Sequence, residues 1–427
     1  MPSIENHPLR YALTNELHAR PFPSTSPPAQ AAFLAFKMSD DAAKQDRERN
    51  RACLLALLDR FGSQHPTPDA THFFGGLGKH QLKWEQHTEF VTYTIFTDSV
   101  SDRAFDPSLW EVFPDDWLAE VPGVCITSAH LRIVQKTQTE AEICAAIDEW
   151  FVPESLAAST VLDQSAIIAG DFRIDASGHM RFAIFADPAT GPRRVGRIVQ
   201  RVCEIETYKA MSMLGLPCAQ KLSRRMGPLD EGMSKLVDDM TGDLGSPDET
   251  LSQLLSIAAD LENLMAQTSF RFGATGAYEA IVNQRISVMR EERYEGRQTF
   301  SEFMMRRFDP AMRTVNSTER RLQSLTDRAL RAGNLLRTRV DVERSAQNQD
   351  LLESMDQRAA LQLRLQKTVE GLSVVAISYY AVNLMVYLAA PLAEQTGLGK
   401  TWLTGMVVLP VVALVWWTVR RIRSAVD

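Results

Sequence analysis

Three residues whose side chains suit metal binding or proton transfer alternate along one segment: Glu85, His87 and Glu89. We predict a strand over residues 81–97, and alternate side chains of a strand point to the same face. Two carboxylates that flank an imidazole could bind a divalent cation or pass a proton. The sequence therefore predicts a polar cluster here with a metal ion as its possible ligand.

His18 and Arg20 could join this cluster if the N-terminal segment folds back over the sheet. A structural explanation of the cluster stays open, because polar residues that alternate with Leu82, Trp84 and Phe90 are also what a solvated strand face produces. No cofactor is identified, and a divalent cation remains possible.

Two further patterns are weaker indications of a binding site. Residues 75–79 are rich in glycine but lack the GxxxxGK[ST] spacing, and His80 stands where a hydroxyl should bind magnesium, so a turn between strands is expected. Arg193, Arg194, Arg197 and Arg201 cluster at a predicted helix start and could attract an anion. The nearby acidic residues 204 and 206 instead indicate pairing within the chain. The sequence contains no GxSxG or HExxH motif.

The composition excludes several classes of protein. The 427 residues carry 46 basic and 53 acidic side chains, a net charge of −7, so no nucleic-acid partner is expected. The N-terminal residues contain no apolar run that resembles a signal peptide. The five cysteines are odd in number and form no CxxC pair, which indicates buried thiols in a reducing compartment.

Two long segments near the C-terminus carry no charge: 371–393, with 23 residues, and 401–419, with 19 residues. A helix needs roughly 20 apolar residues to cross a bilayer core of about 30 Å. The connector 394–400 leaves room only for a tight hairpin, and Pro410 should kink the second helix. The sequence therefore predicts a two-helix transmembrane hairpin, with the lipid bilayer as a partner.

Basic residues predict the orientation of this hairpin. Arg358, Arg364, Lys367, Arg420, Arg421 and Arg423 flank the two segments on one side, whereas only Lys400 lies in the connector. Both termini are therefore expected in the cytoplasm. Inside the segments, Ser378, Tyr379, Tyr380, Asn383 and Thr404 carry hydrogen-bonding groups. Polar groups such as Tyr380 and Asn383 need partners in lipid, which favours a homo-oligomer or a partner protein, although one bond within the hairpin is an alternative for Asn383.

The periodicity predicts three parts. Residues 1–188 read as a cytoplasmic α+β domain, 189–367 as a helical bundle and stalk, and 368–427 as the transmembrane hairpin with a basic tail. The expected strands are 30–37, 72–78, 81–97, 124–134, 166–174 and 180–185, and the expected helices of this domain are 41–61 and 139–150. Helices are also expected over 192–214, from residue 246, and over 334–370, which has neither glycine nor proline and lacks a strict heptad.

Several blocks resemble an uncharacterised family of bacterial membrane-anchored proteins. These blocks are His7-Pro8-Leu9-Arg10, Glu16-Leu17-His18-Ala19-Arg20-Pro21, Trp84-Glu85-Gln86-His87-Thr88-Glu89-Phe90, Glu204-Ile205-Glu206-Thr207-Tyr208 and Thr368-Val369-Glu370-Gly371-Leu372-Ser373. The resemblance covers nearly the whole chain. It implies the inner membrane of a Gram-negative bacterium and no activity, because the family is a domain of unknown function.

The predicted architecture is also similar to that of the magnesium-channel class, which joins a cytoplasmic α/β domain, a stalk helix and a two-helix hairpin in a ring. The Tyr-Gly-Met-Asn signature of that class corresponds to Tyr380-Ala381-Val382-Asn383, which differs at two of four positions and lies near mid-span.

Three functions are therefore hypotheses. The first is a non-enzymatic, homo-oligomeric, membrane-anchored scaffold, sensor or regulator. The second is an ion channel or transporter of the magnesium-channel architecture. The third is a metal-dependent enzyme that uses the face formed by Glu85, His87 and Glu89.

Overall fold

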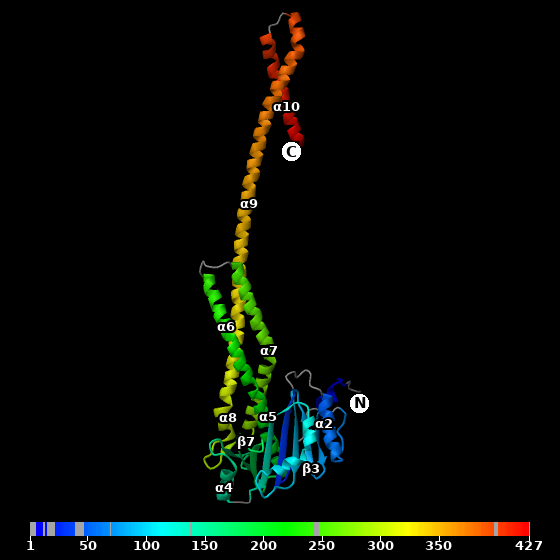
Figure 1. Ribbon diagram of the computed structural model, residues 1–427, viewed down its shortest axis with the longest axis vertical. Helices are drawn as coiled ribbons and strands as arrows, with labels where there is room; N and C mark the ends of the chain where they lie inside the picture. The colour runs from blue at the N-terminus through cyan, green and yellow to red at the C-terminus, as the bar shows by residue number, and fades with distance from the viewer. Residues whose placement is uncertain are drawn as a thin grey trace. The chain divides into compact units, whose positions relative to one another are not determined.

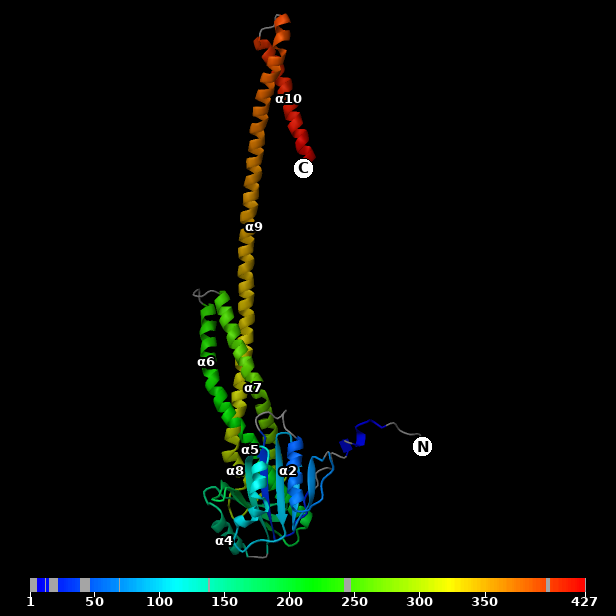
Figure 2. The ribbon, with the colours of Figure 1, turned by 45° about the vertical axis from the view of Figure 1, so that its right-hand side comes forward.

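A computed structural model describes residues 6–11, 13–14, 22–38, 47–68, 70–136, 139–241, 247–396 and 400–426. The chain divides into two compact units, of which the first comprises residues 1–245 and 252–332 and the second 246–251 and 333–427 (Figures 1 and 2). The elements are β1 (Ala29–Lys37), α2 (Arg47–Arg60), β2 (His72–Leu77), β3 (His80–Gln86), β4 (Phe90–Thr97), η2 (Pro107–Val112), α3 (Asp115–Glu120), β5 (Val124–Gln135), α4 (Glu140–Trp150), β6 (Ala157–Val161), β7 (Ala166–Ile174), β8 (Met180–Ala186), α5 (Pro192–Met213), α6 (Gly215–Thr241), α7 (Pro247–Ser287), β9 (Glu292–Arg293), α8 (Phe300–Arg307), α9 (Asp309–Thr396) and α10 (Lys400–Val426).

The first unit is built on one sheet of nine strands in the order β2-β3-β4-β1-β5-β8-β7-β6-β9. All of the neighbouring pairs are antiparallel except β5 and β8, which run parallel. Helices cover both faces, so the unit is an α/β domain, and the expectation of a mixed α and β domain is confirmed. The short strands β6 and β9 were not expected from the sequence.

The sheet separates two cores because the side chains of each strand alternate between its faces. On β1, Ala31 and Phe33 pack with Val199 of α5, whereas Ala32 and Leu34 pack with the leucines of α2. A third apolar cluster lies under α4 on the same face as α2. The burial of β1 on both faces explains why it is apolar along nearly its whole length.

Local signals locate several elements correctly. Thr139 caps α4, where its hydroxyl accepts a hydrogen bond from the N–H of Glu142 and the Glu142 carboxylate accepts one from the N–H of Thr139. Gly78 has a φ of +57° in the turn between β2 and β3, which confirms the expected glycine turn. The predicted strands over 30–37 and 124–134 and the predicted helix over 192–214 correspond to β1, β5 and α5.

The single strand predicted over residues 81–97 is wrong. The chain reverses after Gln86, and β3 and β4 pair as an antiparallel hairpin with Gln86 opposite Val91. The backbone N–H of His87 donates to the carbonyl of Phe90 at 2.8 Å and closes the turn. The sequence of this turn contains no glycine, proline or asparagine, so the usual turn signal is missing.

The rest of the first unit is helical. The helices α6 and α7 lie beside the first part of α9 in both views (Figures 1 and 2). Two ion pairs connect α9 to Asp230 of α6, one from Arg321 at 3.0 Å and one from Arg328 at 3.2 Å. The predicted helix over 334–370 lies within α9, and the helix predicted from residue 246 corresponds to α7, although residue 246 itself is outside the described residues.

The second unit contains the rest of α9 and all of α10. Both helices hold an 18-residue window that is long and apolar enough to cross a membrane, with mean hydropathies of 1.7 and 1.2. The helices expected over 371–393 and 401–419 are therefore present as far as they are described. The division of the chain at residues 188 and 367 stays a prediction.

The segment 22–28, which we call the strap, crosses the first turns of α5. The N–H of Thr25 donates to the carbonyl of Pro192 at 3.3 Å, and the Arg197 guanidinium lies 5.0 Å from the ring centre of Phe22. A Cβ atom on Gly196 would lie 1.8 Å from the carbonyl oxygen of Pro23, so only glycine allows this contact. The strap is therefore packed tightly against the helix.

We expect Gly196→Ala to lower the free energy of unfolding by roughly 1–3 kcal/mol, because the added methyl group overlaps a backbone oxygen that cannot rotate away. Gly273 of α7 is the matched control, since a Cβ atom there meets no atom within 4 Å. Gly273→Ala should raise the stability of the helix by up to about 1 kcal/mol. Denaturant unfolding of the purified chain measures both changes, and an equal response of the two variants would contradict the packing of the strap.

Candidate functional site

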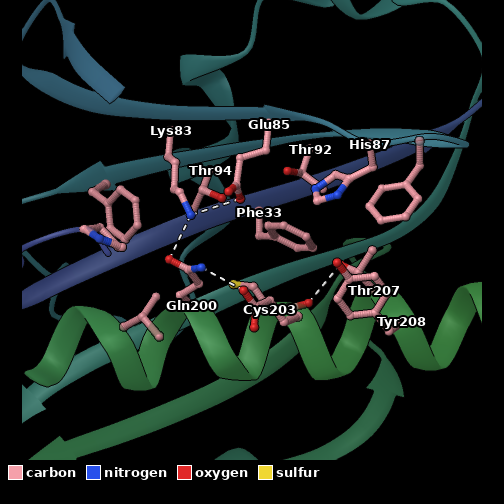
Figure 3. A pocket seen from close by; sticks show the side chains of 15 residues that line it. Phe33, Lys83, Glu85, His87, Thr92, Thr94, Gln200, Cys203, Thr207 and Tyr208 are labelled. Atoms are coloured by element: carbon pink, nitrogen blue, oxygen red, sulfur yellow. Dashed lines mark hydrogen bonds and ion pairs between the residues drawn. The ribbon is translucent and has the colours of Figure 1, made fainter. Parts of the chain in front are cut away.

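The face of β3 and β4 that meets α5 carries polar side chains. Lys83 and Glu85 of β3 lie opposite Thr94 and Thr92 of β4, so all four share that face. In Figure 3 these side chains point from the strands toward the helix. Lys83, Thr92 and Thr94 are each at least nine-tenths buried, which is unusual for a lysine.

The facing side of α5 completes a small cavity. Gln200, Cys203, Thr207 and Tyr208 recur at helical spacing and lie toward the sheet (Figure 3). The cavity has a volume of about 30 Å³, which is room for about two water molecules. Its apolar walls are Pro23, Phe33, Phe90, Phe96 and Val199.

A chain of ionic contacts runs through this layer from β3 to α7. The Lys83 ammonium lies 2.9 Å from the Glu85 carboxylate and donates to the Gln200 side-chain carbonyl at 2.8 Å. The amide of Gln200 donates to Glu204 at 2.7 Å, and Glu204 in turn pairs with Arg285 of α7. Each buried charge therefore has a partner of opposite sign, which is what burial of ions requires.

The cavity nevertheless keeps unused hydrogen-bonding capacity. A lysine ammonium has three N–H donors, and among the described residues Lys83 uses them on two oxygens. The hydroxyl-bearing side chains of Thr92 and Thr94 line the same cavity on the strand face of Lys83. The cavity therefore offers one ammonium donor and two hydroxyls to a small polar molecule.

The structure separates the three residues that were predicted to share a strand face. Glu85 and His87 line the cavity, but Glu89 follows the chain reversal and does not. Glu89 is 4% exposed, pairs with Arg271 and accepts a hydrogen bond from the Tyr278 hydroxyl at 3.0 Å. Glu89 thus fastens the β3–β4 turn to α7, and this tertiary contact holds a turn that its own sequence does not encode.

The arrangement does not resemble a metal centre. Across the described residues, no group of three or more His, Cys, Asp or Glu side chains is placed to hold a metal ion. Glu85 and Glu89 each pair with a cationic side chain of the protein instead. His18 and Arg20, which were expected to join the cluster, lie outside the described residues.

The arginine cluster at the start of α5 pairs differently from the prediction. Glu204 and Glu206 are paired within the chain, as expected, but with Arg285 and Lys209. Arg194 instead pairs with Asp163 at 3.6 Å and donates to the carbonyl of Leu162 at 3.1 Å.

Tyr380 and Asn383, the two polar residues that were predicted to lie within the membrane, are on α9 in the second unit. Tyr380 is 72% exposed, and its ring centre lies 5.8 Å from that of Tyr379. Asn383 is half-buried. Ser378, on the same helix, is 6% exposed, and its hydroxyl has no hydrogen-bond partner among the described residues.

All five cysteines are free, but the expectation that they are buried holds only in part. Cys53 and Cys203 are buried, whereas Cys125 is exposed. Burial raises the pKa of the Cys203 thiol, and burial also raises the pKa of Cys53 to about 11. Both thiols are therefore protonated and poor nucleophiles at neutral pH.

A second polar cluster, on the opposite face of the sheet, was missed in the sequence. Ser128, His130 and Arg132 occupy alternate positions of β5. This alternation was the only feature of the sequence that could have indicated the cluster. His130 is 2% exposed, and its Nε2–H donates to Gln30 at 3.3 Å. The Ser128 hydroxyl and Nδ1 of His179 form a hydrogen bond of 2.8 Å. The ring of His179 stacks on the ring of Trp110, with 3.5 Å between the ring centres.

We expect Lys83→Met to lower the free energy of unfolding by about 3 kcal/mol, because the Glu85 carboxylate would stay buried without its counter-ion. The double variant Lys83→Met, Glu85→Leu should cost less than the single one. Arg60→Met is the matched control, since the Arg60–Asp116 pair is solvent-exposed and should contribute far less. Denaturant unfolding followed by tryptophan fluorescence measures the three losses. A double variant that is less stable than Lys83→Met would contradict the buried pair.

His130 should make the protein sensitive to acid. Burial, together with the nearby His179 and Arg132, lowers the pKa of His130 to about 4, against weaker opposing effects of Asp175 and Asp106. The unfolded chain, with a His pKa of about 6.5, then binds more protons than the folded chain between pH 6.5 and 4. The free energy of unfolding should therefore fall by up to about 3 kcal/mol as the pH drops through this window.

Denaturant unfolding at several pH values measures this slope. His130→Gln should flatten it between pH 6.5 and 4, whereas substitution of the exposed His65 by glutamine should leave it in place. An unchanged slope in His130→Gln would show that another group is responsible.

Comparisons with known proteins give one match. Residues 5–426 match the family described as Protein of unknown function (DUF3422). No curated protein and no solved structure matches the chain. Because the match covers nearly the whole sequence, as the resemblance of the sequence blocks predicted, the chain belongs to the DUF3422 family of proteins of unknown function.

Proposed function

We propose that the protein is a non-enzymatic, membrane-anchored scaffold, sensor or regulator whose α/β domain faces the cytoplasm. One observation carries this proposal: the apolar windows of α9 and α10, each long enough to cross a membrane, are almost entirely uncovered. Only 11% of the residues in each apolar window are buried within the chain. A core helix of a soluble protein would bury most of such a window.

The exposed side chains make the argument quantitative. Leu384 and Leu388 of α9 are 64% and 67% exposed, and Leu409 of α10 is 77% exposed. Full burial of one leucine is worth roughly 1.5–3 kcal/mol relative to exposure in water. A run of such residues on two helices needs an apolar surrounding, and a lipid bilayer provides it along the whole length of both.

Charge and aromatic residues favour a hairpin with both ends in the cytoplasm. The guanidiniums of Arg420 and Arg421 lie over the rings of Trp416 and Trp417 at 4.9 and 5.2 Å. Tryptophan belongs at the level of the lipid headgroups, and arginine prefers the cytoplasmic side. The family resemblance adds the inner membrane of a bacterium to this proposal.

Polar groups within the apolar helices favour a homo-oligomer. The Ser378 hydroxyl is buried and has no hydrogen-bond partner in the described part of the chain, and the Tyr380 side chain is exposed on α9. Hydrogen bonds to a second copy of the helix would satisfy such groups in lipid. Oligomerisation through the membrane segment is therefore part of the proposal.

The two other functions stay alternatives. An ion channel rests on the predicted architecture and on Asn383, and ion flux through the reconstituted protein would support it. A metal-dependent enzyme rests on Glu85, His87 and Glu89, and metal bound to the purified chain would support it. The pairing of Glu85 with Lys83 and of Glu89 with Arg271 favours the non-enzymatic proposal.

A charge placed within the apolar part of α9 should weaken anchoring. The double variant Leu384→Arg, Leu388→Arg puts two charges on one helix face, each of which costs roughly 2.5–3.5 kcal/mol at the centre of a membrane helix. The expected result is a large loss of protein from carbonate-washed membranes.

The double variant Leu351→Arg, Met355→Arg is the matched control. It adds the same charges at the same spacing on the same helix, at residues that are 61% and 59% exposed but lie outside the uncharged segment. It should remain in the membrane fraction. If carbonate without detergent releases the unaltered chain, the proposal is wrong.

A further inference from the structure

A second hollow lies next to the cavity between the sheet and α5. It has a volume of about 330 Å³ and is lined by the β3–β4 turn together with residues of α2, α5 and α7. His87, Phe90 and Tyr208 line this outer hollow and also the cavity of about 30 Å³. Side chains that line two neighbouring hollows stand between them, so we call these three rings the aromatic partition.

The rings of the aromatic partition are in mutual contact. His87 stacks on Phe90 with 4.3 Å between ring centres, and the edge of Tyr208 meets Phe90 at 5.9 Å and His87 at 6.3 Å. Phe90 is fully buried in β4, whereas His87 and Tyr208 are half-buried. His87 and Tyr208 are therefore the two rings of the partition that are partly exposed.

The opposite end of the cavity is closed in another way. Pro23 of the strap lines the cavity there, and its carbonyl oxygen occupies the place that a side chain on residue 196 would take. Backbone packing of this kind cannot open by rotation of a side chain. The aromatic partition is thus the end of the cavity that a side-chain movement can open.

We propose that the cavity and the outer hollow are two parts of one binding site, that the aromatic partition is its entrance, and that its ligand is a small uncharged molecule with a planar ring and a hydrogen-bond acceptor. Joined, the two hollows reach the lower end of the range of roughly 300–1,000 Å³ that small-molecule sites occupy. This inference concerns the α/β domain alone and does not depend on membrane anchoring.

The lining residues define this class of ligand. Phe33, Phe96 and the rings of the aromatic partition offer flat apolar surfaces to a planar ring. The third N–H of Lys83 and the hydroxyls of Thr92 and Thr94 can donate to an acceptor. The Lys83 charge is already neutralised by Glu85, so a charged ligand would enter a low-dielectric site without a counter-ion.

Cys203 provides a reporter inside the cavity, and Cys53 provides an internal control. Both thiols are buried, but Cys53 belongs to α2 and packs against the other face of the sheet. The full chain in detergent is treated with methyl methanethiosulfonate, and the rate of modification of each cysteine is read by peptide mass spectrometry. Opening of the partition exposes only Cys203, whereas global unfolding exposes both.

We expect Tyr208→Ala to raise the rate at Cys203 by roughly tenfold or more while the rate at Cys53 stays unchanged, since only local opening is made easier. His87→Ala, in the turn, is the second variant in case Tyr208→Ala unfolds the domain. Phe22→Ala in the strap is the control and should leave both rates unchanged. The proposed entrance is refuted if neither partition variant raises the modification rate of Cys203 specifically. It is also refuted if Phe22→Ala raises that rate more than the partition variants do.

The ligand class is tested with benzamide and benzoate as probes on the variant that labels faster. Benzamide, which is uncharged, should slow the modification of Cys203, and benzoate at the same concentration should not. Adding Thr92→Val and Thr94→Val should abolish the protection. Protection by benzoate alone, or by neither probe, would overturn the proposed ligand class.

Discussion

A lysine buried between a sheet and a helix must be neutralised, and the layer that surrounds Lys83 is organised by this requirement. Glu85 supplies the counter-charge from the same strand, and Gln200 of α5 accepts a hydrogen bond from Lys83. The amide of Gln200 in turn donates to Glu204, which forms an ion pair with Arg285 of α7. The sheet, α5 and α7 are therefore held together by one series of charge-assisted contacts, which are stronger than neutral hydrogen bonds.

The same requirement shapes the cavity. Lys83, Thr92 and Thr94 all line the space of about 30 Å³ that remains between the sheet and α5. The aromatic partition closes one end and the strap closes the other. A space with polar groups on its wall can hold a small molecule or water that hydrogen-bonds to them, whereas a wholly apolar cavity stays dry.

The second unit differs from the first in the side chains that it leaves exposed. Its helices leave leucine, tyrosine and tryptophan side chains uncovered, whereas the helices of the first unit bury theirs. The contrast between the two units is the physical basis for the proposal that the protein binds a small molecule with one part and is anchored in a bilayer by the other.

Sequence patterns determined much of this protein. Uncharged length identified the two apolar helices, a short apolar run identified β1, and the absence of glycine and proline identified residues 334–370 of α9. The polar character of Glu85 and His87 also pointed to the cavity that they line. These features are local, because each depends on the spacing of residues that are close in the chain.

Tertiary structure alone decided the rest. The reversal between β3 and β4 has no turn residue of its own and is held by the contacts of Glu89 with Arg271 and Tyr278, which lie more than 180 residues away. Glu89, a candidate metal ligand in the sequence, instead uses its carboxylate for these contacts and holds the turn against α7. Periodicity cannot reveal such a pairing, because the partner of a buried charge is chosen by where distant segments meet and not by the residues beside it in the sequence.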